Sequence, residues 1–368
     1  MGTEQQAPQQ LVETLRNDNM LWRLHAQRLL VERGQLDVLP ALIELVEDRS
    51  MDEIGLNVGA IHALWTLHGL GALDGTHPEA TAAVVKTLHH PSAGVQRNAL
   101  LVLPRTKDSI RPLLDSGILL TDDPQVQLAA LLTLSEMPAD KSLGRAIAAE
   151  LTIPPTINDR WLSDAITAAA AAHDLHVLRT VAEDGRNFRP PAREILGRVA
   201  EHYARGGPAD SVNSLLELLP KADRRNAAAI LLGLSRGWPK DKRVELSDAA
   251  EQALVDLMPT LSTEGRAGVL MLAAAWHSER FAKAIDQLAA ELLKSAANDS
   301  ESAEDRVNSA RLLIRFRPDD DRVVNDLLEA VTPGTPTRVA AGIFDALEQS
   351  RSAAVGPAIV ERLGALTP

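Results

Sequence analysis

The chain has 368 residues, a formal net charge of −12, only 3% aromatic residues and no cysteine. The absence of thiols excludes disulfides, thiolate metal sites and covalent c-type haem attachment. The acidic balance disfavours nucleic-acid binding by a generally basic surface, so we expect no nucleic-acid partner. No apolar run reaches the roughly 20 residues that a spanning helix needs, and we expect no membrane span.

The first ten residues, MGTEQQAPQQ, lack the apolar segment of a signal peptide. We expect residues 1–10 to form a disordered lead-in. A chain without cysteine and without a signal peptide is compatible with the cytoplasm and, if a leader has been removed, with the periplasm.

Helical periodicity begins after this lead-in. The helix predicted over residues 20–34 ends at Gly34, which suits a left-handed cap. The elements predicted in the first ninety residues lie at 11–16, 20–34, 36–46, 51–70 and 78–89.

The clearest repeat is the stretch DPQVQLAALLTLSEMP, residues 123–138. Asp123 is placed to cap a helix and Pro124 fits its first turn. A second helix is predicted over residues 141–151. The segment that starts at Ser92 has the same pattern 31 residues earlier, with Val, Ala and Leu at matching positions.

Similar helix pairs follow to the end of the chain, and we find no convincing strand. First helices are predicted at 158–172, 190–205, 224–236, 263–276, 303–316 and 337–349. Their partners are predicted at 175–183, 209–219, 247–261, 280–297, 321–330 and 353–366.

Helix pairs that recur every 30 to 40 residues or so are typical of an α-solenoid, because one pair cannot bury its own apolar stripe. We therefore predict an all-α fold, a right-handed α-α superhelix of the HEAT/armadillo-like type with about nine to ten helical hairpins. Residues 11–368 are expected to form a single continuous solenoid.

The Val-x-x-x-Ala core of residues 92–138 resembles the HEAT repeat, as does the segment 300–350. Armadillo repeats and unclassified helical repeats are the alternatives. In both alternatives the chain remains a stack of helical hairpins.

A second resemblance covers Leu11–Gly34 and the following LPALIELV. The residues that carry it are Leu11, Val12, Leu15, Asn19, Trp22, Arg23, Ala26, Gln27, Arg28, Leu29, Leu30, Glu32 and Arg33. The segment resembles the HEAT-like region of planctomycete-type multidomain putative dehydrogenases, between a sorbosone-dehydrogenase-like propeller and a cytochrome c domain. The resemblance implies a connecting or docking module. It does not assign oxidoreductase activity to these residues, because the Cys-x-x-Cys-His haem motif is missing.

Histidines and acidic clusters are the candidate reactive groups. His62 and His68 are six residues apart and would lie on different faces of one helix, while Asp174 is expected to start a helix between His173 and His176. The acidic clusters at residues 122–123, 301–305 and 319–321 precede or begin helices, where carboxylates cap the free amides. We predict no catalytic, cofactor-binding or metal-binding residue, and no cofactor.

Trp22, Arg23 and Arg28 are the candidate partner-binding residues, because a Trp beside Arg can anchor a protein partner. The alternative is that Trp22 packs on the neighbouring repeat and Arg23 pairs with a nearby acid. The other four tryptophans are expected to pack between repeats.

These features predict a non-catalytic HEAT-like scaffold or protein-interaction module, part of a larger multidomain bacterial protein. Its partner would be another protein or a neighbouring domain of the same polypeptide, bound on a concave face lined by the second helices. One alternative is an enzyme on helical repeats, DNA alkyl-glycosylase-like or bilin-lyase-like. The other is a docking segment of a haem or quinoprotein dehydrogenase whose redox domains lie outside this sequence.

Overall fold

The computed structural model describes residues 3–239 and 242–366, and every regular element in those ranges is a helix. The predicted all-α fold of paired helices is confirmed. Contacts divide the chain into two compact units, unit 1 up to Thr180 and unit 2 from Val181. Each unit is described by itself, and the single continuous solenoid over residues 11–368 stays a prediction.

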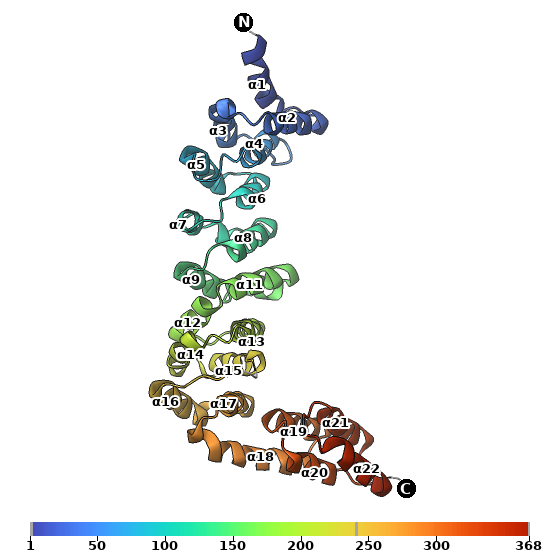
Figure 1. Cartoon of the computed structure of the whole chain (residues 1–368). Helices are drawn as coiled ribbons and strands as arrows, with labels where there is room; N and C mark the ends of the chain where they lie inside the picture. The colour runs from blue at the N-terminus through green and yellow to red at the C-terminus, as the bar shows by residue number, and fades with distance from the viewer. Residues whose placement is uncertain (1–2, 240–241, 367–368) are drawn as a thin grey trace. The chain divides into compact units, whose positions relative to one another are not determined.

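Unit 1 consists of two rows of helices (Figure 1). The first row is α2 (Met20–Arg33), α4 (Val58–Gly69), α6 (Ala93–Val102), α8 (Pro124–Glu136) and α11 (Arg160–Ala172), and each helix packs on the next. The second row is α3 (Leu39–Glu47), α5 (Pro78–Lys86), α7 (Lys107–Asp115) and α9 (Lys141–Glu150). α12 (Asp174–Asp184) carries the chain from one unit into the next.

The capping predicted for the repeat is present. The Asp123 carboxylate accepts hydrogen bonds from the amides of Gln125 and Val126, at 2.9 and 3.0 Å, and so starts α8. The residues that match between the two copies, Val95, Ala99, Leu103, Val126, Ala130 and Leu134, are all buried. The alanines among them, Ala99 and Ala130, let successive first helices lie close together.

Two boundaries differ from the prediction. α4 begins at Val58 rather than at residue 51, because the Asp52 carboxylate accepts the amides of Ile54 and Leu56 and closes a turn before Asn57 caps the helix. α1 spans Thr3–Thr14 and includes Pro8, whereas the sequence predicted a lead-in up to residue 10. Residues 1 and 2 lie outside the described residues.

Unit 2 continues the pattern with α13 (Pro190–Arg205), α15 (Arg224–Gly237) and α17 (Thr263–Ala275) packed in succession. Their partners are α14 (Ala209–Leu216) and α16 (Asp248–Leu257). The last helices are α18 (Ala282–Ala297), α19 (Ala303–Phe316), α20 (Asp321–Glu329), α21 (Thr337–Leu347) and α22 (Val355–Leu366).

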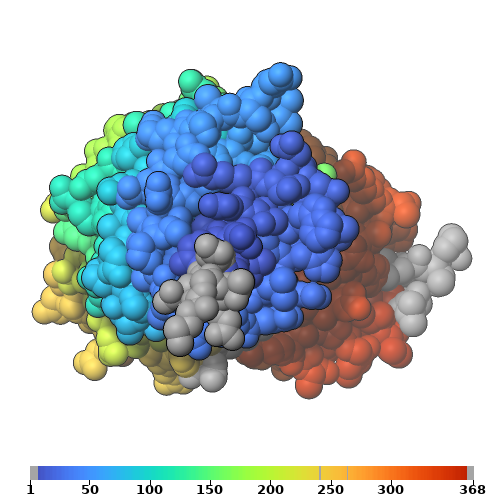
Figure 2. Space-filling view, turned by 90° about the horizontal axis from the view of Figure 1, so that it is seen from above, coloured from blue at the N-terminus to red at the C-terminus, as the bar shows by residue number. Residues whose placement is uncertain are grey.

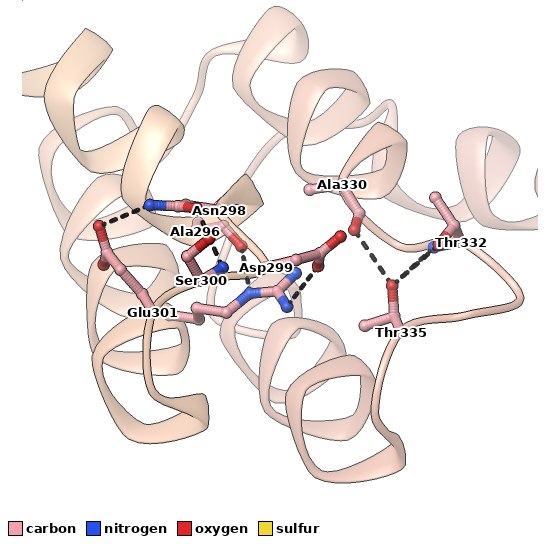
Figure 3. A network of polar contacts seen from close by, with 9 residues as sticks. Ala296, Asn298, Asp299, Ser300, Glu301, Ala330, Thr332 and Thr335 are labelled. Atoms are coloured by element: carbon pink, nitrogen blue, oxygen red, sulfur yellow. Dashed lines mark hydrogen bonds and ion pairs between the residues drawn. The ribbon is translucent and has the colours of Figure 1, made fainter.

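A buried arginine ties the end of α18 to the start of α19. Arg306 is only 2% exposed; its Nε donates to the carbonyl oxygen of Ala296 at 3.0 Å and its Nη1 to Asp299 at 2.7 Å. Figure 3 labels Ala296 and Asp299, and also the turn between α20 and α21, in which the Thr335 hydroxyl oxygen accepts the amide of Thr332 at 2.9 Å. A buried guanidinium depends on such partners, because it has lost its hydration.

Asp299→Asn is therefore expected to lower the unfolding free energy by about 1 kcal/mol, since the acceptor remains but the charge opposite a buried cation is lost. The control is Asp286→Asn, which removes the acid of the exposed pair with Arg317 and should change stability by less than about 0.5 kcal/mol. Urea unfolding of both variants measures the difference. Equal effects would show that Asp299 does not compensate the buried charge.

Unit 1 contains a buried carboxyl group. Glu150 of α9 is 3% exposed. Its Oε2 accepts one hydrogen bond from the hydroxyl of Thr156 at 3.3 Å and another from Nε2 of Gln127 at 3.4 Å. Burial raises the pKa of Glu150 above its usual 4.5, although the two hydrogen bonds act in the opposite direction. The folded protein therefore holds this proton at pH values where the unfolded chain releases it.

This shift has a defined effect on stability. The Glu150 contribution to the unfolding free energy is largest below pH 4.5 and declines as the pH rises towards the folded-state pKa. As the pH rises above 4.5, we expect the unfolding free energy of Glu150→Gln to increase relative to that of the unsubstituted chain. Above the folded-state pKa the difference between the two unfolding free energies should no longer change with pH. Urea unfolding over a pH series tests this, and a difference that does not vary with pH would contradict it.

Candidate partner-binding surface

The histidines and acidic residues considered as candidate reactive groups make contacts that support the fold. His173 Nε2 contacts the carbonyl oxygen of Leu134 at 2.8 Å, and α12 starts at Asp174 as expected. The side chain of Asp320 caps α20, whereas Ser302 rather than an acid caps α19. In the described ranges, no three His, Asp or Glu side chains are grouped as a metal site would require. No helix there is long and apolar enough to cross a membrane.

The tryptophans differ in their surroundings. Trp65 of α4 donates to Asn98 of α6 at 2.8 Å, and Trp238 and Trp276 pack edge to face with ring centres 4.9 Å apart. These three bridge repeats as predicted. The prediction was wrong for Trp161, which is 62% exposed and lies under the Arg160 guanidinium.

The largest group of exposed apolar side chains lies on α2. Met20, Leu21, Trp22, Leu24 and Leu29 are 43 to 59% exposed, and we call these five residues the α2 apolar surface. Leu21 and Leu24, three residues apart, share one helix face, and Trp22 and Leu29, about two turns apart, share another. The buried residues of the helix, Ala26 and Leu30, lie next to the face of Trp22 and Leu29.

α2 buries fewer of its side chains than a helix inside the row. The internal helix α8 packs between α6 and α11 and buries seven side chains, whereas α2 buries two. α2 packs mainly on α1 and α4. Figure 2 looks onto this end of unit 1, where the blue surface of its first helices faces the viewer.

The three residues predicted to bind a partner have different surroundings on this helix. Trp22 is 55% exposed, 6.4 Å from the ring of His25, and is therefore available for contact. Arg28 is exposed and lies 3.5 Å from Glu32. Arg23 pairs with no acid among the described residues: its Nη1 donates to the carbonyl oxygens of Asn17 and Asp18 at 2.5 and 2.9 Å, which holds the turn before α2. Whether these residues bind a partner stays a prediction.

One partly buried hydrogen bond joins α2 to α4. Nδ1 of His62 in α4 lies 2.7 Å from Oε1 of Gln27, and an amide oxygen can only accept, so His62 donates. Burial, and then the positive charge of Arg23, lower the pKa of His62. The neutral imidazole therefore links α2 to α4 at pH 7.

Sequence reasoning selected Trp22, Arg23 and Arg28 but missed the other four apolar members of the surface. Apolar residues occur on all sides of α2, so periodicity alone did not distinguish the buried face from the exposed one.

No family model matches the sequence, and no curated protein matches it. An engineered protein of solved structure is 16% identical with a TM-score of 0.36, over 93% of this chain and 98% of that chain. A mutant of Kap121p is 13% identical with a TM-score of 0.39, over 96% of this chain and 45% of the Kap121p chain. The chain therefore spans less than half of that Kap121p chain, and scores this low carry no inference about function.

Proposed function

We propose that this chain is a non-catalytic helical-repeat scaffold that binds a protein partner, or a neighbouring domain of the same polypeptide, through the α2 apolar surface. The observation that supports this is the exposure of five large apolar side chains on one helix. Their individual exposed areas add up to on the order of 500 Å² of apolar area.

The chemistry of the surface favours an amphipathic helix as its partner. The charges on and beside this helix are already paired, Arg28 with Glu32 and Arg33 with Asp37, so α2 offers its apolar side chains together with paired rather than free charge. Apolar residues three and four positions apart on a partner helix would match the stripes of α2. A rigid Trp among them suits an interface centre.

The resemblance of residues 11–34 to the HEAT-like region of planctomycete-type dehydrogenases suggests a neighbouring domain as one such partner. In that case the module would dock redox domains and carry no redox chemistry itself. This proposal rests on the residues quoted above and is separate from the exposure argument.

Site-specific photo-crosslinking tests the proposed function. A photoreactive amino acid replaces Leu21 in the full chain, and the matched control replaces Ile54, which is 79% exposed but lies outside α2. In a cell extract from the source, we expect a defined protein adduct at position 21 that is absent at position 54. Identical adducts at both positions, or none at either, would contradict the proposal.

A further inference from the structure

Unit 1 also contains an open groove of about 710 Å³ at the edge where its loops lie. One wall is the short helix at Ile118–Leu120 with the start of α8, and the other is α10 (Pro154–Asn158) with the start of α11. Leu120 on the first wall is 74% exposed, although it is a large apolar side chain. Pro154 and Pro155 form a stiff part of the second wall that has no backbone N–H to donate.

The charged residues that line the groove are both acids, Asp122 and Asp159. Asp159 uses Oδ1 to cap α11, where it accepts the amides of Trp161 and Leu162 at 2.8 and 2.9 Å, and its second oxygen makes no hydrogen bond to any described residue. Asp122 is exposed and forms no ion pair within the described ranges. The adjacent cation, Arg160, lies 5.0 Å over the Trp161 ring and does not line the groove.

One of the neutral polar residues that line the groove, Gln127, also offers an acceptor. Gln127 is 8% exposed, and its Nε2 donates to Thr156 at 3.0 Å while Thr156 in turn donates to Glu150. This chain of donors fixes the orientation of the amide. With Nε2 as the donor, Oε1 of Gln127 accepts no hydrogen bond from any residue that the structure describes. Because Gln127 lines the groove, this oxygen is an acceptor that a bound segment can use.

We infer that this groove binds a segment of a partner protein that has one large apolar side chain flanked by lysine or arginine. The apolar side chain would lie against Leu120 and the two prolines, where it covers surface that is otherwise exposed to water. The flanking cations would lie near Asp122 and Asp159, and a donor of the segment would satisfy Gln127. An acidic segment would be repelled by the carboxylates of Asp122 and Asp159, one on each wall. A purely polar segment would bury no apolar side chain against Leu120.

This inference goes beyond the proposed function, because the groove and the α2 apolar surface share no residue. Selection from a library of random peptides displayed on phage tests it with the full chain as bait. Two variants serve for counter-selection: Leu120→Asp, and Asp122→Lys combined with Asp159→Asn. Asn caps a helix about as well as Asp, so the second variant should keep α11 intact.

We expect the enriched peptides to share an apolar residue with Lys or Arg close by. A synthetic peptide of the consensus sequence should lose about tenfold or more in affinity for each variant, corresponding to about 1.4 kcal/mol. Its binding should also weaken as the salt concentration rises. Val360→Asp, at an apolar residue that is 68% exposed in unit 2, should leave the affinity unchanged.

Enriched peptides without basic residues would overturn the inference, as would equal affinity for the unsubstituted chain and both variants. Failure to enrich any peptide over the counter-selection would also overturn it. Substitutions on α2 should not alter peptide binding, so failure here is distinguishable from failure of the proposed function.

Discussion

Replacing both Leu21 and Leu29 with glutamate is expected to weaken binding of the cross-linked partner by about 30-fold or more, because residues at an interface centre contribute about 2 kcal/mol or more. Both side chains are roughly half exposed in the free chain, at 56 and 43%. The two carboxylates would be desolvated on binding without a partner charge. Titration calorimetry with the purified partner measures the loss.

The same double variant should unfold at nearly the same temperature as the unsubstituted chain, since exposed substitutions change stability by less than about 0.5 kcal/mol each. Ile54→Glu makes the same kind of change at an exposed apolar residue outside α2 and should leave affinity intact. Unchanged affinity in the double variant would exclude the α2 apolar surface as the interface. A large fall in thermal stability would instead show that the side chains support the fold.

Gly233→Ala is expected to destabilise unit 2 by about 2 kcal/mol, because overpacking a tight helix contact costs about 1 to 3 kcal/mol. A Cβ on Gly233 of α15 would lie 2.2 Å from the carbonyl oxygen of Gly197 in α13 and 2.8 Å from Cβ of Ala200. Neither atom belongs to a flexible side-chain end, so the two helices would have to separate. In an unconstrained helix the same change would stabilise by up to about 1 kcal/mol.

Gly197→Ala is the matched control. Its Cβ would lie 3.6 Å from the carbonyl oxygen of Ala229, an ordinary contact distance, so the gain in helix propensity should appear as up to about 1 kcal/mol of added stability. Urea unfolding followed by circular dichroism compares the two variants. If Gly233→Ala is as stable as Gly197→Ala, the close approach of α13 and α15 is not present in solution.

Much of the fold was predictable because its signals are local. Asp123 and Pro124 define the start of α8, Gly34 ends α2 with a φ of 65°, and α13 and α19 begin and end at the predicted residues. The start of α4 was not predictable from periodicity, since residues 51–57 include apolar residues at helical spacing. The Asp52 turn that displaces the helix depends on side-chain hydrogen bonds to the backbone.

The candidate surfaces were only partly predictable for a different reason. Whether Trp22 or Leu24 is covered depends on which helix lies beside α2, and that is a property of the stack rather than of the segment. The groove beside Leu120 brings together residues more than thirty positions apart, such as Asp122 and Asp159. No local pattern in either segment indicates that the two lie on opposite walls of one site.

The central claim is that the α2 apolar surface is open in the free chain and covered in the complex. Carbene footprinting of the full chain, alone and with the cross-linked partner, measures this directly. We predict heavy labelling of Leu21, Trp22 and Leu24 in the free chain, strong protection in the complex, and equal labelling of Ile54 in both. Labelling of α2 that is already weak in the free chain, or unchanged in the complex, would contradict the claim.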